Sequence, residues 1–285
     1  MALDTLPVLV VIGGGGIGLA TAHRLGAGRH ILFASRSPST ISVGAESLKK
    51  AGHKVTTQQV DVSSYESVAA LAKMAASLGG PIKTVVLTSA ISPHMGSTEM
   101  ILAINILGTA NVIEAFGKEV EMPSGSSLVC VGSMVQHMAP PLSPDLEKHL
   151  ATAPLPNLLE DDELHAVISG MSGIAGTGGA AYFMSKKANS LRVQAAAVSK
   201  DYAGRGVRVN CVSPGMTETN MLTFEMDGES GEGIREMLKA HPMKRAGTAE
   251  EVADAVAFVV ECEYVNGTDL LVDGGYIAQM KWNAM

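Results

Sequence analysis

Near its start, the 285-residue chain reads Val8-Leu9-Val10-Val11-Ile12-Gly13-Gly14-Gly15-Gly16-Ile17-Gly18. The apolar, largely β-branched run predicts a buried strand, and the alanine-containing residues after Gly18 predict a helix. Gly13, Gly15 and Gly18 match the pattern G-x-G-x-x-G between these two elements. In that setting the first glycine permits a tight turn, the second lets the backbone approach a pyrophosphate, and the third lets helix and strand pack closely. The stretch therefore predicts a dinucleotide-binding turn, with a flexible glycine linker as the alternative.

Short β-branched runs alternate with longer alanine-rich segments along the rest of the chain. The runs are continuously apolar, which suits strands of a parallel sheet that is covered on both faces. This alternation predicts a doubly wound α/β sheet, the Rossmann arrangement, with about seven strands in a single domain. The predicted strands are Val8–Ile12, His30–Ala34, Lys54–Val60, Lys83–Thr88, Ser127–Val131, Val207–Val212 and Asp269–Val272. The predicted helices are Gly16–Gly26, Ile41–Ala51, Tyr65–Leu78, Thr98–Phe116, Ala180–Tyr202 and Ala249–Val260.

Two segments interrupt this alternation. Residues 134–179 separate a strand from the next helix, where a connection of about 2–6 residues is usual, and they contain several prolines and an acidic run. We interpret them as an insertion that forms a lid or a subunit contact, the alternative being a solvated loop without a role. Residues 217–242 hold three glycines in an acidic stretch. They are predicted to form a flexible substrate-binding segment with a helix at Ile234–Lys239.

Composition excludes several classes of protein. The chain has 21 Lys and Arg against 28 Asp and Glu, a formal net charge of −7, which argues against a protein that binds nucleic acid by neutralising phosphates. No apolar run reaches the roughly 18 residues of a membrane span, and the N-terminus lacks the features of a secretory signal. Cys130, Cys211 and Cys262 are too far apart in the sequence to indicate a disulfide framework or a metal site. We expect a cytoplasmic protein with no metal and with no nucleic-acid or membrane partner.

A basic residue follows the second predicted strand. Ser35-Arg36-Ser37 stands where an acidic side chain would bind the ribose 2′-hydroxyl of NAD. Arg36 can instead pair with a 2′-phosphate, to which Ser35 and Ser37 can donate hydrogen bonds. This favours NADP(H) over NAD(H), the alternative being a surface arginine at the end of a strand. After the third strand, Asp61 and Val62 are expected to reach the adenine.

A tyrosine and a lysine stand four residues apart in Tyr182-Phe183-Met184-Ser185-Lys186. On a helix this spacing places the phenol and the ammonium on one face. A nearby ammonium stabilises the phenolate and so lowers the pKa of the tyrosine. Such a tyrosine can pass a proton to or from a carbonyl or alcohol oxygen. The spacing alone leaves open a surface Tyr–Lys pair without a role.

Taken together, these motifs resemble the short-chain dehydrogenase/reductase family over nearly the whole chain. Further matches, in the family's order, are residues 104–109, 127–133, 206–219, 242–252 and 266–275. The resemblance implies a catalytic set whose members are Asn105, Ser133, Tyr182 and Lys186. In that set Tyr182 is the acid/base, and Lys186 binds the nicotinamide ribose and lowers the pKa of Tyr182. Ser133 hydrogen-bonds the substrate oxygen, and Asn105 holds a water that connects Lys186 to solvent.

The expected cofactor contacts combine the motif residues with those that the resemblance implies, among which Thr219 matches the residue that contacts the nicotinamide carboxamide. They are Gly13, Gly15, Gly16, Ile17, Gly18, Ser35, Arg36, Ser37, Asp61, Val62, Ser89, Ala90, Tyr182, Lys186, Pro214, Gly215, Thr217 and Thr219. Three features depart from the family's pattern. The glycine turn is one residue shorter and lacks its threonine, and Thr88-Ser89-Ala90-Ile91 replaces Asn-Asn-Ala-Gly after the fourth strand. Ser133 and Tyr182 are also much farther apart in the sequence than in ordinary members.

The resemblance implies an NADP(H)-dependent oxidoreductase that interconverts a ketone or aldehyde and an alcohol on a fairly apolar small molecule. The alternative is a cofactor-binding protein of the same fold that serves as a cyclase, an isomerase or a regulator without redox turnover. The resemblance also implies a homo-dimer or homo-tetramer. The helices Thr98–Phe116 and Ala180–Tyr202 would then form the main interface.

Overall fold

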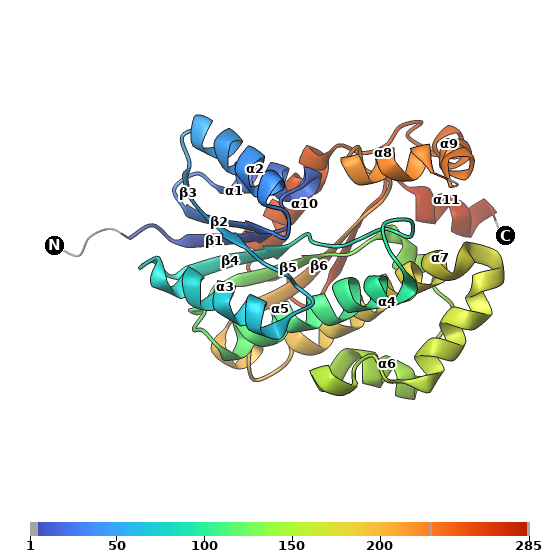
Figure 1. Cartoon of the computed structure of the whole chain (residues 1–285), viewed down its shortest axis with the longest axis horizontal. Coiled ribbons are helices and arrows are strands. Elements are labelled where there is room, and N and C mark those ends of the chain that lie inside the picture. Colours follow the sequence, from blue (N-terminus) through green and yellow to red (C-terminus); the bar gives the residue numbers. More distant parts are fainter. Residues whose placement is uncertain (1–4, 229, 284–285) are drawn as a thin grey trace.

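A seven-stranded parallel sheet forms the centre of the computed structural model, which describes residues 5–228 and 230–283 (Figure 1). The strand order is β3-β2-β1-β4-β5-β6-β7, so the direction of winding reverses between β1 and β4. Ligands of such sheets bind at the carboxyl ends of the strands beside this reversal. The predicted doubly wound fold with about seven strands is confirmed. The strands are β1 (Val8–Ile12), β2 (His30–Ser35), β3 (Lys54–Gln59), β4 (Ile82–Leu87), β5 (Ser127–Val131), β6 (Arg208–Pro214) and β7 (Asp269–Val272).

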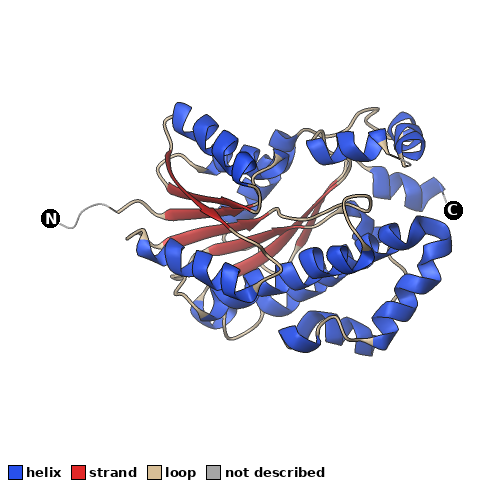
Figure 2. Ribbon diagram, in the orientation of Figure 1, coloured by secondary structure: helices blue, strands red, loops and turns tan. Residues whose placement is uncertain are grey.

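Helices cover both faces of the sheet (Figure 2). One apolar core lies between the sheet and α3, α5 and α7, and a second lies between the sheet and α1, α2 and α10. The helices are α1 (Gly16–Leu25), α2 (Pro38–Lys50), α3 (Tyr65–Ser77), α4 (Thr98–Ile101), α5 (Gly108–Lys118), α6 (Pro144–Thr152), α7 (Asp162–Ala197), α8 (Asn220–Asp227), α9 (Gly231–Ala240), α10 (Ala249–Glu261) and α11 (Tyr276–Asn283).

Strand β1 shows why the strands are continuously apolar. Val8, Val10 and Ile12 pack into the first core, whereas Leu9 and Val11 pack into the second. Successive side chains of a strand point to opposite faces, so a sheet covered on both faces buries all of them. Strands β3 and β7 are the exceptions, because they lie at the two edges of the sheet and are only partly buried.

The long helix predicted at Thr98–Phe116 is interrupted. It consists of α4, a π-helical segment at Leu102–Leu107, and α5. The stretch Thr98–Lys118 has the length and composition of a membrane-crossing helix, yet 72% of its most apolar window is buried inside the molecule. Burial of this kind is expected for a core helix, and π-helical turns concentrate at functional sites.

The insertion at residues 134–179 is largely helical, which its prolines and acidic run did not suggest. Ser143 caps α6 by accepting a hydrogen bond from a backbone amide of the first turn, and Pro144 follows as the first helical residue. Asp161 caps α7 in the same way. Serine and aspartate are common N-caps and proline is favoured at the first helical position, so these residues start helices here.

The helix that carries Tyr182 and Lys186 also extends farther toward its N-terminus than predicted. Helix α7 begins at Asp162 rather than Ala180, ends at Ala197, and bends at Gly176, whose φ of 69° favours glycine. The segment 217–242, predicted to be flexible with one helix, contains both α8 and α9.

The insertion packs on the outside of the sheet-covering helices, where Figure 1 shows α6 beside α7. Leu146, Leu150 and Leu158 are fully or almost fully buried in a third apolar core that also includes residues of α5 and α7. This core covers part of the face that was predicted to be the subunit interface. A homo-oligomer through that face, which stays a prediction, would have to include α6.

Replacement of Leu150 by alanine is expected to lower the free energy of unfolding by about 2–5 kcal/mol, because the side chain is 0% exposed and its loss leaves a cavity. Urea denaturation measures the change. Val43→Ala, at a residue of α2 that is 68% exposed, is the control and should have little effect. A loss below about 0.5 kcal/mol for Leu150→Ala, the size usual for surface substitutions, would show that the insertion does not belong to the cooperative fold.

Candidate active site

The glycine turn between β1 and α1 has the geometry that its sequence predicts. Gly13 has a φ of 118°, which L-residues with a side chain rarely adopt. A Cβ atom on Gly18 would lie 1.8 Å from the carbonyl oxygen of Gly13, so only glycine permits this contact of helix and strand. A Cβ atom on Gly15 would meet no atom within 4 Å, which leaves its backbone open to a ligand.

Thr88, which follows β4, takes part in this turn. Its Oγ1 donates a hydrogen bond to the carbonyl of Gly13 at 3.0 Å, and its backbone amide and that of Ser89 donate to the carbonyl of Ile12. The family's threonine within the turn and the asparagines after the fourth strand are both absent here. Thr88 and Ser89 hold the turn against the central strands in their place.

A cavity of about 370 Å³ lies over the turn. Sequence reasoning missed several other residues that line it, among them Thr40, Thr88, Asn220 and Met221. The last two follow Thr219 directly, so the first turn of the next helix was the available signal. The predicted cofactor residues that do not line this cavity, and whose contact with the cofactor stays a prediction, are Tyr182, Lys186, Pro214, Gly215 and Thr217. The predicted cofactor residues that line it are Gly13, Gly15, Gly16, Ile17, Gly18, Ser35, Arg36, Ser37, Asp61, Val62, Ser89, Ala90 and Thr219.

Arg36 lies at the rim of this cavity with its side chain exposed. Within residues 5–228 and 230–283, no carboxylate lies within ion-pair distance of its guanidinium. Ser37 caps α2 by accepting a hydrogen bond from the amide of Thr40, so the positive end of α2 also faces this region. The rim can therefore attract an anionic group.

The reactive side chains come from the end of β5 and from α7. Ser133 follows β5, and its hydroxyl lies close enough to Tyr182 to lower the pKa of the phenol. The Nζ atom of Lys186 lies 5.5 Å from the centroid of the Tyr182 ring and donates to the carbonyl of Val131 at 3.5 Å. The helical spacing of four residues thus brings the phenol and the ammonium together.

Burial is the main cause of the pKa shifts of Tyr182 and Lys186. It raises the pKa of Tyr182, the Ser133 hydroxyl acts in the opposite direction, and the Glu225 carboxylate raises the pKa further. The lowered pKa expected for Tyr182 is therefore wrong for this structure, because the loss of hydration is the largest contribution to the shift. Burial also lowers the pKa of Lys186 to about 8, since this side chain is only 2% exposed.

Asn105, in the π-helical segment, connects two parts of the site. Its Nδ2 donates to the carbonyl of Ile91 and to Oγ of Ser185, and its Oδ1 accepts from the amide of Ile91. Ser185 in turn donates to the carbonyl of Tyr182. The side chain of Asn105 thus joins the loop after β4 to the helix that carries the tyrosine, and its predicted role in holding a water stays a prediction.

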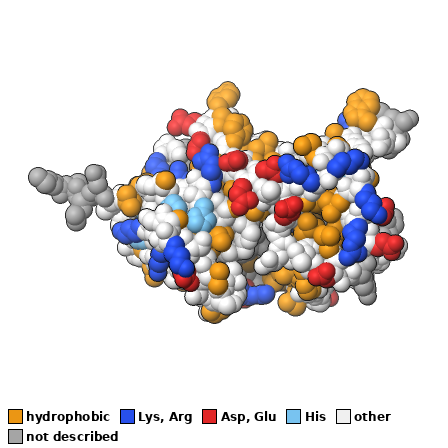
Figure 3. All heavy atoms as spheres, turned by 90° about the horizontal axis from the view of Figure 1, so that it is seen from above, with side chains coloured by type: hydrophobic (Ala, Val, Ile, Leu, Met, Phe, Trp, Pro, Cys, Tyr) orange, Lys and Arg blue, Asp and Glu red, His pale blue; other side chains and the backbone are white. Residues whose placement is uncertain are grey.

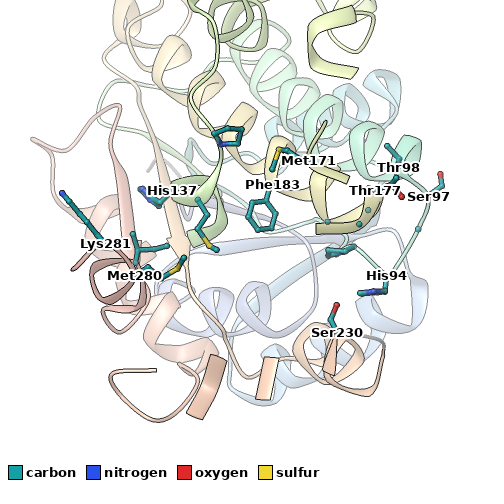
Figure 4. A pocket seen from close by; sticks show the side chains of 18 residues that line it. His94, Ser97, Thr98, His137, Met171, Thr177, Phe183, Ser230, Met280 and Lys281 are labelled. Carbon is teal, nitrogen blue, oxygen red and sulfur yellow. The ribbon is translucent and has the colours of Figure 1, made fainter. Parts of the chain in front are cut away.

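A larger cleft of about 1300 Å³ is lined by Phe183, the residue that follows Tyr182 (Figure 4). The walls come from the loop after β4, from the insertion and from α11. Figure 3 shows hydrophobic side chains among charged ones on the face of the molecule seen from above. Sequence reasoning did not anticipate the contribution of α11. The apolar side chains that line the cleft are Pro93, Met138, Pro140, Met171, Phe183, Ile277 and Met280.

Two histidines at this cleft are paired with carboxylates. His94 contacts Glu225 at 2.7 Å, and His137 contacts Asp269 at 2.8 Å. Among the residues that the structure describes, no group of three His, Cys, Asp or Glu side chains could hold a metal ion.

The chain is similar to known oxidoreductases over nearly all of its length. The family model described as short chain dehydrogenase matches residues 7–144, and the one described as enoyl-(acyl carrier protein) reductase matches residues 151–277. The "Short-chain dehydrogenase/reductase bsc3" of Alternaria brassicicola is 35% identical over 275 residues, which cover 95% of this chain and 96% of that protein.

Two solved structures share the fold. The 3-alpha-hydroxysteroid dehydrogenase of a Pseudomonas species, complexed with NADH, has a TM-score of 0.72 at 24% identity, covering 98% of this chain and 100% of that one. An actinorhodin polyketide ketoreductase with NADPH has a TM-score of 0.71 at 22% identity, covering 97% and 99%. Fold, motif order and full-length similarity agree, and the chain belongs to the short-chain dehydrogenase/reductase family of oxidoreductases.

Proposed function

We propose that the protein is an NADP(H)-dependent oxidoreductase that interconverts a ketone or aldehyde and an alcohol on a fairly apolar small molecule. One observation carries this proposal: Ser133 lies close enough to Tyr182 to shift the pKa of its phenol, and the buried ammonium of Lys186 lies 5.5 Å from the centroid of the Tyr182 ring. A phenol and a hydroxyl at one point can hold and protonate a single carbonyl oxygen. The cleft beside Phe183 supplies the apolar walls for the rest of such a substrate.

The cavity over the glycine turn fits a dinucleotide. Gly15 leaves room for close approach of a pyrophosphate, and α1 directs its N-terminus at the turn with no acidic residue in its first turn. Arg36 has the charge to pair with a 2′-phosphate. A bound nicotinamide would supply hydride chemistry. Because one solved neighbour carries NADH and another NADPH, the preference for NADP(H) rests on Arg36.

Each reactive side chain has a role that follows from its environment. The raised pKa keeps the phenol of Tyr182 protonated at neutral pH, so that it can donate a proton to the substrate oxygen during reduction. Lys186 then stabilises the phenolate that remains, and Ser133 holds the same oxygen through its hydroxyl. In oxidation the phenolate accepts the proton from the alcohol. We further propose a cytoplasmic location and a homo-dimer or homo-tetramer.

Tyr182→Phe removes only the hydroxyl group of the phenol. Because general acid catalysis contributes about 10²–10⁴-fold, NADPH-dependent reduction of a carbonyl panel should fall by that factor while NADPH binding is kept. Tyr264→Phe, at a fully exposed tyrosine, is the matched control and should keep full activity. If the wild-type protein binds NADPH yet turns over no carbonyl or alcohol, the cyclase, isomerase or regulator alternative is favoured instead.

Arg36→Ala should weaken NADPH binding by about 10-fold or more and leave NADH binding nearly unchanged, because hydrogen bonds to a charged group contribute about 1.5–3 kcal/mol. Titration of both cofactors by intrinsic or nicotinamide fluorescence measures the change. Arg24→Ala, at an ion-paired residue of α1, is the control. Equal losses for the two cofactors would contradict the proposed preference for NADP(H).

Met171→Ser should lower kcat/KM for bulky apolar carbonyl compounds by about tenfold, since a difference of one methylene in an apolar pocket corresponds to about 10–200-fold. Small carbonyl compounds that do not reach Met171 should be affected much less. Met74→Ser, at an exposed position of α3, is the control. The same change for small and bulky compounds would show that the cleft does not bind the substrate.

A further inference from the structure

A buried carboxylate joins α8 to the loop that follows β4. Glu225, in α8, is 8% exposed, and its carboxylate accepts three hydrogen bonds. The donors are the hydroxyl of Ser92, the backbone amide of His94 at 3.2 Å, and Nδ1 of His94 at 2.7 Å. These contacts connect segments that are more than 130 residues apart in the chain.

Such a carboxylate is held in one place. A buried carboxylate loses its hydration, and only well-placed donors offset that cost. The three donors here include one that is charged when His94 is protonated, and charge-assisted hydrogen bonds are the stronger kind. Glu225 therefore favours the arrangement in which α8 lies against residues 92–94.

Helix α8 forms one wall of the cavity over the glycine turn, and the loop after β4 forms the opposite wall. At its N-cap, Thr219 lies so close to Gly16 that an added Cβ would be 2.5 Å from the Thr219 methyl group. Asn220 and Met221 line the cavity from α8, and Ala90, Ile91 and Met95 line it from the loop. The contacts of Glu225 with Ser92 and His94 thus connect the two walls.

The joined walls also border the reactive site. His94 lines the larger cleft as well, and the Glu225 carboxylate is close enough to raise the pKa of Tyr182. An opening of the contact between α8 and residues 92–94 would separate two walls of the cavity over the glycine turn and release one wall of the larger cleft.

We propose that Glu225 is a positioning residue. Its contacts with Ser92 and His94, here called the latch, hold α8 against the loop after β4 across the cavity over the glycine turn and thereby limit the release of the bound cofactor. This inference rests on the proposed function, because it takes the cavity over the glycine turn as the cofactor site. Lid opening and product release limit the turnover of many enzymes. The latch raises the fraction of molecules in which α8 lies against residues 92–94. The apparent affinity for the cofactor depends on that fraction.

Glu225→Gln keeps the shape of the side chain and removes its charge. Displacement of bound NADPH in a stopped-flow instrument should show release faster by about tenfold, with a weaker Kd. Hydrogen exchange of the amides at residues 220–227, measured in the cofactor-free protein, should also become faster. Glu236→Gln on α9, where Glu236 makes an exposed ion pair with Lys239, is the matched control and should change neither quantity.

Ser92→Ala and His94→Asn remove the partners and keep the inference testable if a Glu225 variant folds poorly. Each should accelerate release, and the combination of His94→Asn with Glu225→Gln should add little to either single change, because both break the same contact. Release within twofold of wild type in a folded Glu225→Gln protein would overturn the latch, as would unchanged exchange at residues 220–227. If the wild-type protein binds no NADPH, the proposed function fails, and the exchange measurement alone decides whether the latch exists.

Discussion

The carbonyl of Gly13 lies so close to Gly18 that only glycine fits at position 18, and a side chain at position 13 would meet Thr88 and Ser89. This contact brings the N-terminus of α1 to the carboxyl end of β1, and the hydroxyl of Thr88 ties the turn to β4. Strands β1 and β4 are the pair between which the winding of the sheet reverses. The cavity over the glycine turn, the loop after β4 and the hydrogen bonds of Asn105 all lie around this point, so their positions depend on the turn.

The sheet could be predicted from sequence because burial on both faces leaves a simple pattern of apolar runs. Its seven strands lie within a few residues of their predicted limits. The insertion could not be assigned in the same way. Pro144 and Asp161 read as loop residues in isolation, yet each stands where a helix begins, and the leucines that follow make sense only once α5 and α7 are in place.

The candidate site, too, could be predicted from the sequence only in part. Short-range patterns predicted the glycine turn, Arg36 and the Tyr182–Lys186 pair, because strand ends and helical spacing determine where those side chains lie. Contacts between segments distant in the chain could not be predicted, and they include the hydrogen bonds of Asn105 with the loop after β4 and those of Glu225 with Ser92 and His94. The direction of the Tyr182 pKa shift depends on burial, a property of the folded protein.

The proposed function requires a nicotinamide cofactor and a carbonyl compound to meet at Tyr182. NADPH deuterated at C4 is incubated with a panel of apolar ketones and aldehydes, and the alcohols are analysed by mass spectrometry. We expect the wild-type protein to form alcohols that carry one deuterium on the carbinol carbon, and Tyr182→Phe to form far less of them. Tight NADPH binding without deuterium transfer to any compound, or equal transfer by both proteins, would contradict the proposed function.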